Sequence, residues 1–213
     1  MARITHKRTG KILYQDSQSI RYTVVCAIAS GTSLAGARLD QIDLRHTELH
    51  SGCFDGADIS ASSFDDADLS SSSFISANLP DSSFDRADLS NVDFTGANLN
   101  GATFRHALLR GANLTSTEMR NADLTGAILT GATLTYADLT GADLTGADLT
   151  GVDLSRTVAE AAATSPRSTP SKRRHTPADT PAPVTPADPH AHCRYAGTCV
   201  PNLVNPSVAR CTP

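Results

Sequence analysis

The sequence predicts an all-β solenoid, a narrow rod of about six stacked four-sided coils with a capping hairpin and helix before it and a disordered tail after it. Two observations carry this prediction. A large apolar residue recurs at every fifth position from Leu34 to Leu154, and a small residue usually stands two positions before it. Aromatic residues make up only 5% of the chain, so the core must be thin and repetitive. We divide the chain into a cap at 1–31, a repeat region at 32–156 and a tail at 157–213.

The N-terminal cap is predicted to contain a β-hairpin and a helix. Short β-prone runs between Ile4 and Tyr14 flank a Thr9-Gly10 turn. The helix that follows is expected to have Ser17 at its N-cap and Gly31 at its end. Its apolar stripe consists of Ile20, Val24, Ala27 and Ile28. We expect this helix, with Cys26 packed in it, to cover the open core of the first coil. The cap's +4 charge suggests a docking surface as the alternative.

The period of five residues excludes both a continuous helix and a flat strand. Along a helix it advances about 500° per repeat and would spread the leucines around the whole cylinder. Along a strand it would send successive leucines to opposite faces. The chain must therefore turn once per repeat, so that the large and small residues point inward while backbone hydrogen bonds stack the coils about 4.8 Å apart.

The six phenylalanines indicate how many sides each coil has. They occupy every second apolar centre, so coils of twenty residues place them in two opposite columns of stacked rings, whereas three-sided coils would stack Phe on Leu. The columns are Phe54, Phe74 and Phe94, and Phe64, Phe84 and Phe104. Serines two positions before a phenylalanine, such as Ser62, Ser72 and Ser82, are expected to be buried and to bond nearby backbone.

Outward-facing residues twenty apart should form vertical ladders in the same register. One ladder holds Arg45, Asp65, Asp85 and Arg105, and its neighbour holds His46, Asp66, Arg86 and His106. We expect Arg45 to pair with Asp65, and Arg86 with Asp66. Each such exposed pair would contribute about 0.2 to 1 kcal/mol, so the ladders indicate register more than stability.

The repeat resembles that of the pentapeptide repeat family, whose unit is a small residue, Asp or Asn, Leu or Phe, and two polar residues. Residues 140–144, Thr-Gly-Ala-Asp-Leu, are close to this consensus, and the match covers about residues 34 to 156. The resemblance implies a right-handed quadrilateral β-helix. It implies little about function, because members of the family serve many roles.

The C-terminal region is predicted to start with a short helix at Val158–Ala163 and to continue as a disordered tail rich in Pro, Thr and Ala. The five cysteines, at positions 26, 53, 193, 199 and 211, are odd in number and scattered, so we expect reduced thiols. The tail cysteines, with His190 and His192, could be considered zinc ligands. They contain no C-x-x-C pair, and we therefore predict neither a metal site nor a cofactor.

Two aliphatic residues interrupt the polar surface of the repeat region. Coils of twenty residues bring Leu108 beside Ile128, at a position that normally holds Asp or Asn. We predict that this pair is a partner-contact site. Ile75 and Tyr136 interrupt the polar surface elsewhere, and we interpret each as a tolerated surface residue.

The charge of the chain is unevenly distributed. Residues 31–156 carry seven Arg and eighteen acidic residues, a formal charge of −11, whereas residues 157–213 carry six basic and three acidic residues, or +3. An acidic rod disfavours direct nucleic-acid binding, which relies on Lys and Arg at the phosphates, and favours a protein partner with a basic surface. The chain has no apolar run of membrane-helix length and no signal-type stretch, so we expect no membrane association and a cytoplasmic location.

These features favour a non-catalytic, protein-binding scaffold. The Asp that precedes many centres belongs to the repeat and is not a catalytic pair, so we predict no catalytic residue and no enzyme activity. The family resemblance offers an alternative. Quinolone-resistance members look like DNA in shape and charge and occupy the DNA-binding saddle of type II topoisomerases such as DNA gyrase. A homodimer is possible under either interpretation.

Overall fold

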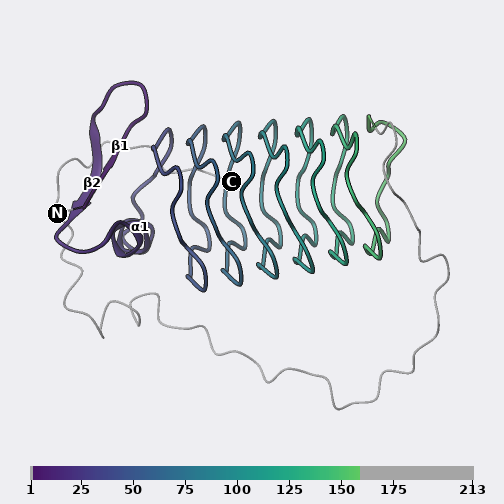
Figure 1. The fold of residues 1–213 in the computed structure, drawn as a ribbon, viewed down its shortest axis with the longest axis horizontal. Helices are drawn as coiled ribbons and strands as arrows, with labels where there is room; N and C mark the ends of the chain where they lie inside the picture. Colours follow the sequence, from purple (N-terminus) through teal and green to yellow (C-terminus); the bar gives the residue numbers. More distant parts are fainter. Residues whose placement is uncertain (1, 159–213) are drawn as a thin grey trace, which may run out of the picture.

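The computed structural model describes residues 2–158, and the repeat region within them forms the predicted four-sided solenoid. Parallel β-bridges join residues twenty apart along the repeat region, from Arg38 with Asp58 to Asp138 with Val158. Each coil therefore has four sides of five residues. The coils stack side by side into a rod, with the N-terminal hairpin and helix at one end (Figure 1).

Backbone hydrogen bonds connect each side of a coil to the coils before and after it. The amide of Phe64 donates to the carbonyl of Ser83 at 2.7 Å, and the amide of Ser83 donates to the carbonyl of Ser62 at 2.9 Å. At the corners, the second residue after a centre has a positive φ, such as 57° at Asp66 and 65° at Gly96. This left-handed conformation explains why Gly, Asn, Asp and Ser recur at that position.

The interior of the rod contains the two predicted columns of phenylalanine rings, and all six side chains are fully buried. Ring centroids within the first column, Phe54, Phe74 and Phe94, are 4.8 and 5.1 Å apart. Those within the second column, Phe64, Phe84 and Phe104, are 4.9 and 5.0 Å apart. Edge-to-face contacts of 5.9 to 6.3 Å join the two columns. The rings therefore form one continuous aromatic core across several coils.

The buried serines beside this core bond the backbone as predicted. The Ser72 hydroxyl donates to the carbonyl of Leu49 at 2.9 Å and accepts from the amide of Gly52 at 3.1 Å. Ser62 and Ser82 repeat the pattern, with hydroxyl-to-carbonyl distances of 3.0 and 2.9 Å. Each hydroxyl satisfies backbone groups of the preceding coil inside the apolar interior, where an unpaired polar group would be costly.

The N-terminal cap consists of strands β1 (Ala2–Thr5) and β2 (Ile12–Asp16), paired antiparallel, and helix α1 (Ile20–Ala29). The expected hairpin and helix are both present. The N-cap, however, is Ser19 and not Ser17, because Ser19 has an extended backbone and its hydroxyl accepts from the amide of Tyr22. The predicted end of the helix is correct, because Gly31 follows the C-cap residue Ser30 and has a left-handed backbone with a φ of 71°.

Helix α1 covers the first coils, as the sequence predicted. Val24, Cys26 and Ala27 are fully buried, and the Ile28 side chain lies 3.1 Å from the point where a Cβ on Gly52 would stand. The prediction for Ile20 is wrong, because this residue is 39% exposed at the first turn of the helix. The apolar stripe therefore starts one turn later than expected.

The hairpin is joined to the first coil by its own backbone bonds. The amide of Lys7 donates to the carbonyl of Gly36 at 2.8 Å, and that of Arg38 donates to the carbonyl of Thr5 at 2.9 Å. Among residues 2–158, no helix has the length and apolar character needed to cross a lipid bilayer. Val158 bridges Asp138, while the rest of the predicted C-terminal helix, the tail and its candidate zinc ligands lie outside the described residues.

Candidate interaction surface

The two predicted contact residues lie in one vertical column of outward side chains. Leu108 and Ile128 are β-bridge partners in consecutive coils, and both are half-buried. Further bridges extend the same column in both directions, to Asp88 before the pair and to Asp148 after it. We call the whole set the mixed column, and its members are Glu48, Asp68, Asp88, Leu108, Ile128 and Asp148.

The carboxylates of the mixed column are held in place by short bonds within their own coils. Asp68 and Asp88 each accept the backbone amide two residues ahead at 2.9 Å. Asp148 accepts both the amide and the hydroxyl of Thr150, at 3.0 and 2.6 Å. The hydroxyl and amide bonds from Thr150 hold the pKa of Asp148 below its ordinary value. The aliphatic pair is therefore flanked on both sides by fixed acidic groups.

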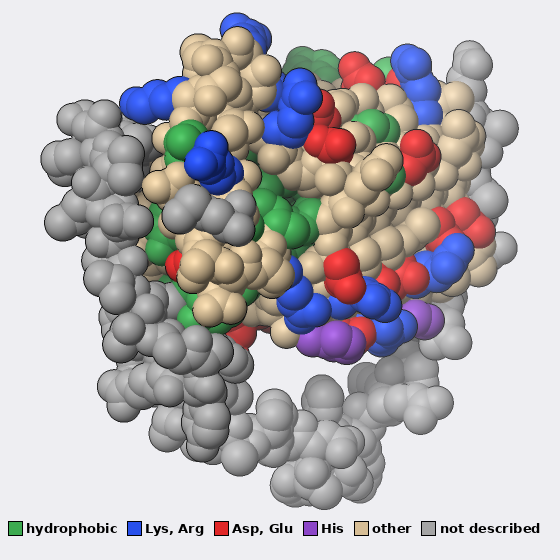
Figure 2. Space-filling view, turned by 60° about the vertical axis from the view of Figure 1, so that its left-hand side comes forward, with side chains coloured by type: hydrophobic (Ala, Val, Ile, Leu, Met, Phe, Trp, Pro, Cys, Tyr) green, Lys and Arg blue, Asp and Glu red, His purple; other side chains and the backbone are tan. Residues whose placement is uncertain are grey.

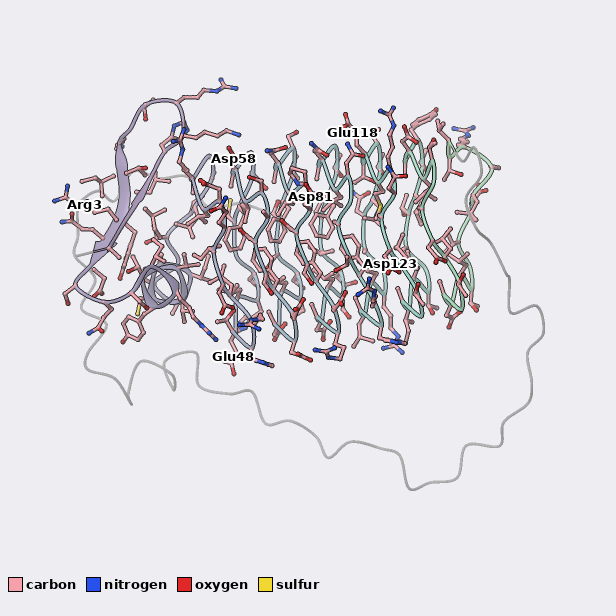
Figure 3. The ribbon with its side chains drawn as sticks, in the orientation of Figure 1. Arg3, Glu48, Asp58, Asp81, Glu118 and Asp123 are labelled. Atoms are coloured by element: carbon pink, nitrogen blue, oxygen red, sulfur yellow. The ribbon has the colours of Figure 1, made fainter. Side chains whose placement is uncertain are left out.

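The opposite side of the rod has a different surface. There Asn78 donates to Asp58 at 3.0 Å, and Asn98 donates to Asn78 at the same distance, which makes a short amide ladder. Figure 3 shows Glu48 at the lower edge of the rod and Asp58 and Glu118 along the upper edge. The mixed column and the amide ladder thus face in opposite directions.

Basic, acidic and His side chains gather along one edge of the rod (Figure 2). The predicted pair of Asp66 and Arg86 is present, with the guanidinium Nε and Nη2 donating at 2.8 and 2.7 Å. The predicted pair of Arg45 and Asp65 is wrong. Arg45 makes two bonds of 3.0 and 2.9 Å to Asp43, two residues before it. A partner in the same coil satisfies both donors of the guanidinium fork, so the next coil is not used.

The bond from Arg86 lowers the pKa of Asp66 below its ordinary value. We expect Arg86→Gln to raise the pKa of Asp66 toward its ordinary value, because the hydrogen bond from Arg86 is the main cause of the lowering. Because the pKa of Asp66 is lower in the folded chain than in the unfolded chain, this pair stabilises the fold at pH values above the unfolded-state pKa. The contribution is lost as the pH falls through the lower, folded-state pKa. A ¹³C NMR titration of the Asp66 carboxyl measures the shift. Arg120 provides the control, because its guanidinium group donates to Asp138, and Arg120→Gln should leave the pKa of Asp66 unchanged. An unchanged pKa of Asp66 in Arg86→Gln would contradict the assignment of this pair.

Two cysteines of the described part differ from the prediction. Cys26 and Cys53 are both disulfide-bonded, so the expectation of reduced thiols is wrong for them. The sequence could not indicate this, because the two residues are far from any other cysteine along the chain.

The remaining surface of residues 2–158 adds little chemistry. These residues contain no group of three or more His, Cys, Asp or Glu side chains arranged to hold a metal ion. Ile75 and Tyr136 are 39% and 60% exposed, and both lie outside the mixed column. The sequence predicted the aliphatic pair at a position that normally holds Asp or Asn, and the same spacing of twenty residues identifies Asp88 and Asp148 as its acidic neighbours.

Several solved structures are similar to parts of this chain. Among solved structures, HetL from the cyanobacterium Nostoc sp. strain PCC 7120, involved in heterocyst differentiation regulation, is 22% identical with a TM-score of 0.41 over 62% of this chain and 81% of its own. Rfr23 from the cyanobacterium Cyanothece 51142 is 26% identical with a TM-score of 0.37 over 60% of this chain and 91% of its own. QnrB1, a plasmid-mediated fluoroquinolone resistance protein, is 18% identical with a TM-score of 0.22 over 58% of this chain and 94% of its own.

None of the curated proteins matches the chain. The family model described as pentapeptide repeats, in contrast, matches eight copies within residues 29–158. This stretch coincides with the twenty-residue coils and the stacked phenylalanines of the structure. The chain therefore belongs to the pentapeptide repeat family, and its rod is the family's right-handed quadrilateral β-helix.

Proposed function

We propose that the protein is a non-catalytic scaffold that binds a protein partner with a basic surface through the mixed column. The observation that supports this proposal is the flanking of the apolar pair, Leu108 and Ile128, by the carboxylates of Asp88 and Asp148. Protein interfaces commonly combine an apolar centre with a polar rim. A partner with one aliphatic or aromatic side chain between two Lys or Arg residues fits this arrangement.

The rigidity of the rod favours such a role. Backbone bonds on every side fix the spacing between successive members of the column, and the filled interior resists deformation. Binding to a preorganised surface loses little conformational entropy on the scaffold side. The −11 charge of residues 31–156 would also accelerate encounter with a basic partner at low salt.

The variant Leu108→Asp with Ile128→Asp tests the proposal. Two added carboxylates remove the apolar centre, and we expect the affinity for a partner isolated with the natural chain to fall about tenfold or more. Biolayer interferometry with the purified partner measures the change, and circular dichroism checks that the variant folds.

Ile75→Asp is the matched control, because Ile75 is an exposed isoleucine on another side of the rod. The proposal requires this control to bind as the natural chain does. Equal affinities of the double variant and the natural chain would show that the mixed column is not the contact.

The DNA-mimic role is the second candidate, favoured by the consecutive carboxylates Glu48, Asp68 and Asp88 at one-coil spacing. A supercoiling assay with purified DNA gyrase separates the two. Inhibition, or protection from a quinolone, at submicromolar protein would support mimicry of DNA. No effect on gyrase would leave the scaffold as the function.

A further inference from the structure

Two exposed apolar residues, Ile75 and Tyr136, lie on the same edge of the rod. The carbonyl of Ile75 accepts from the amide of Gly56 at 2.8 Å, and the amide of Tyr136 donates to the carbonyl of Arg156 at 2.9 Å. The coils between them continue this series of backbone bonds. We call this corner of the rod the Tyr136 edge, and its residues in successive coils are 55–56, 75–76, 95–96, 115–116, 135–136 and 155–156.

Tyr136 is an unusual residue for its backbone conformation. Its φ is 62°, and its side chain is 60% exposed. A left-handed backbone is unfavourable for residues that carry a Cβ, and the corner positions before Tyr136 on this edge hold only small residues, namely Gly56, Ser76, Gly96 and Ser116. The ring gains nothing from the core, whereas tyrosine is enriched among the residues that dominate binding interfaces. A backbone outlier that packing does not explain points to a contact outside the chain.

Charged residues stand only at the two ends of the Tyr136 edge. Asp55 lies in the coil before Ile75, and Arg156 lies in the coil after Tyr136. Five coil spacings of about 4.8 Å separate these two ends, or roughly 24 Å. Along the rod the edge therefore presents an acid, an aliphatic side chain, two coils of small or hydroxyl side chains, an aromatic ring and a base. This order is complementary to its own reverse.

We propose that the Tyr136 edge joins two copies of the chain into an antiparallel dimer. A two-fold axis perpendicular to the rod, between the coils of Gly96 and Ser116, places the coil of Tyr136 opposite that of Ile75 in the second copy. The same axis places Arg156 opposite Asp55 of the second copy. Each contact occurs twice, as a two-fold interface requires. A parallel arrangement would instead place acid opposite acid and base opposite base.

The middle of the edge allows the two rods to approach each other closely. Gly96 has no side chain, and the side chains of Ser76 and Ser116 are short. The ring of Tyr136 therefore has room over the coil that holds Ser76 and Ile75 of the second copy. Small residues between an aliphatic and an aromatic contact produce a surface that two identical rods can share.

Electrostatics favours this edge over the more highly charged ones. Residues 31–156 carry a charge of −11, so two rods repel each other unless the facing residues are neutral or oppositely charged. The next edge but one carries Asp65, Asp66 and Asp85, which would oppose such an approach. The mixed column lies on another side of the rod, so the dimer does not depend on the proposed function and leaves both mixed columns exposed.

The size of the edge predicts a weak dimer. It supplies about a dozen residues from each copy, fewer than the roughly 20 to 30 a side of a standard interface. We expect a monomer–dimer equilibrium that depends on protein concentration. Sedimentation velocity of the full chain, with free thiols alkylated, measures it between about 10 μM and 1 mM. A natural chain that stays monomeric over this whole range would overturn the proposal.

Tyr136→Asn tests the role of the ring. Asparagine tolerates a left-handed backbone, so the variant should fold as the natural chain does, and circular dichroism checks this. We expect the dissociation constant of the dimer to rise about tenfold or more. His106→Asn is the matched control, because it replaces a ring at the same corner position of another edge, where φ is 57°. An unchanged dissociation constant in Tyr136→Asn, or an equal rise in His106→Asn, would contradict the assignment of the edge.

A charge swap tests the antiparallel direction. Arg156→Asp and Asp55→Lys each place like charges opposite each other, and each should raise the dissociation constant about fivefold or more. The two substitutions together restore opposite charges and should recover dimerisation. Circular dichroism is needed as a check, because the Asp55 carboxylate also accepts from the amide of Ile75 at 3.0 Å. Failure of the folded double variant to recover would overturn the pairing of these two ends.

Photocrosslinking locates the contact without changing the charge. Tyr136→p-benzoylphenylalanine keeps an aromatic side chain and links it to the nearest residues on irradiation. Trypsin cuts after Lys and Arg, so residue 136 lies in peptide 121–156 and Ile75 in peptide 46–86. We expect mass spectrometry of the covalent dimer to find peptide 121–156 linked to peptide 46–86. Linkage of peptide 121–156 to itself would indicate a parallel or end-to-end dimer, and either that result or the absence of a covalent dimer would overturn the proposal.

Discussion

Phe84→Ala is expected to lower the free energy of unfolding by about 3 to 5 kcal/mol, the usual cost of removing a fully buried ring. Phe84 lies in the middle of its column, 4.9 Å from Phe64 and 5.0 Å from Phe104 between ring centroids. It also makes an edge-to-face contact of 5.9 Å with Phe94. The backbone of each coil is hydrogen-bonded on both sides, so the walls of the rod cannot collapse into the cavity. Urea denaturation followed by circular dichroism measures the loss.

The control for this variant is Ile75→Ala, which removes an exposed side chain from the same coils. Its effect should stay within about 0.5 kcal/mol, as for most surface substitutions. A loss below about 1 kcal/mol for Phe84→Ala, well short of the range for a buried ring, would mean that the aromatic columns are not tightly packed.

Val24→Asp is expected to have a comparable effect at the capped end. Val24 is fully buried on the face of α1 that covers the first coils, and an unpaired carboxylate there should cost about 3 to 5 kcal/mol. The helix would detach and expose the backbone edge and core of the first coil. Exposed strand edges pair with other chains, so the variant should also self-associate. Urea denaturation and light scattering during size-exclusion chromatography measure the two effects.

Ile20→Asp is the control within the same helix. Ile20 is 39% exposed and occupies the first turn of α1, where an acidic side chain is favourable by about 0.3 to 1 kcal/mol. This variant should remain monomeric and as stable as the natural chain. If Val24→Asp stayed monomeric with unchanged stability, the role of α1 as a cover for the coil would be wrong.

The fold could be predicted from the sequence because one constraint recurs in every repeat. The spacing of five residues determines the corner, and the spacing of ten between phenylalanines determines the number of sides. Both deductions depend on backbone geometry, which every repeat shares. The buried serines followed from the same register, since Ser72 has carbonyl and amide groups of the preceding coil within reach.

Details that depend on a choice between local partners could not be predicted in this way. Arg45 had two acidic neighbours, and the choice of Asp43 over Asp65 depends on the geometry of one guanidinium group. Ser17 and Ser19 are equally suitable N-cap residues by type, and the backbone conformation at Ser19 decides between them.

The repeat of twenty residues per coil also constrains how the gene of such a protein can change in length. Inserting or deleting one whole coil of twenty residues, such as residues 94–113, would lengthen or shorten the rod. Every later side chain would still face the same side of the rod. A change of five residues between Leu108 and Ile128 would preserve the packing inside but rotate everything after it by a quarter turn, so that Ile128 would no longer face the same side of the rod as Leu108. Length variation during evolution can therefore rearrange the outer surface of this molecule without disturbing its interior.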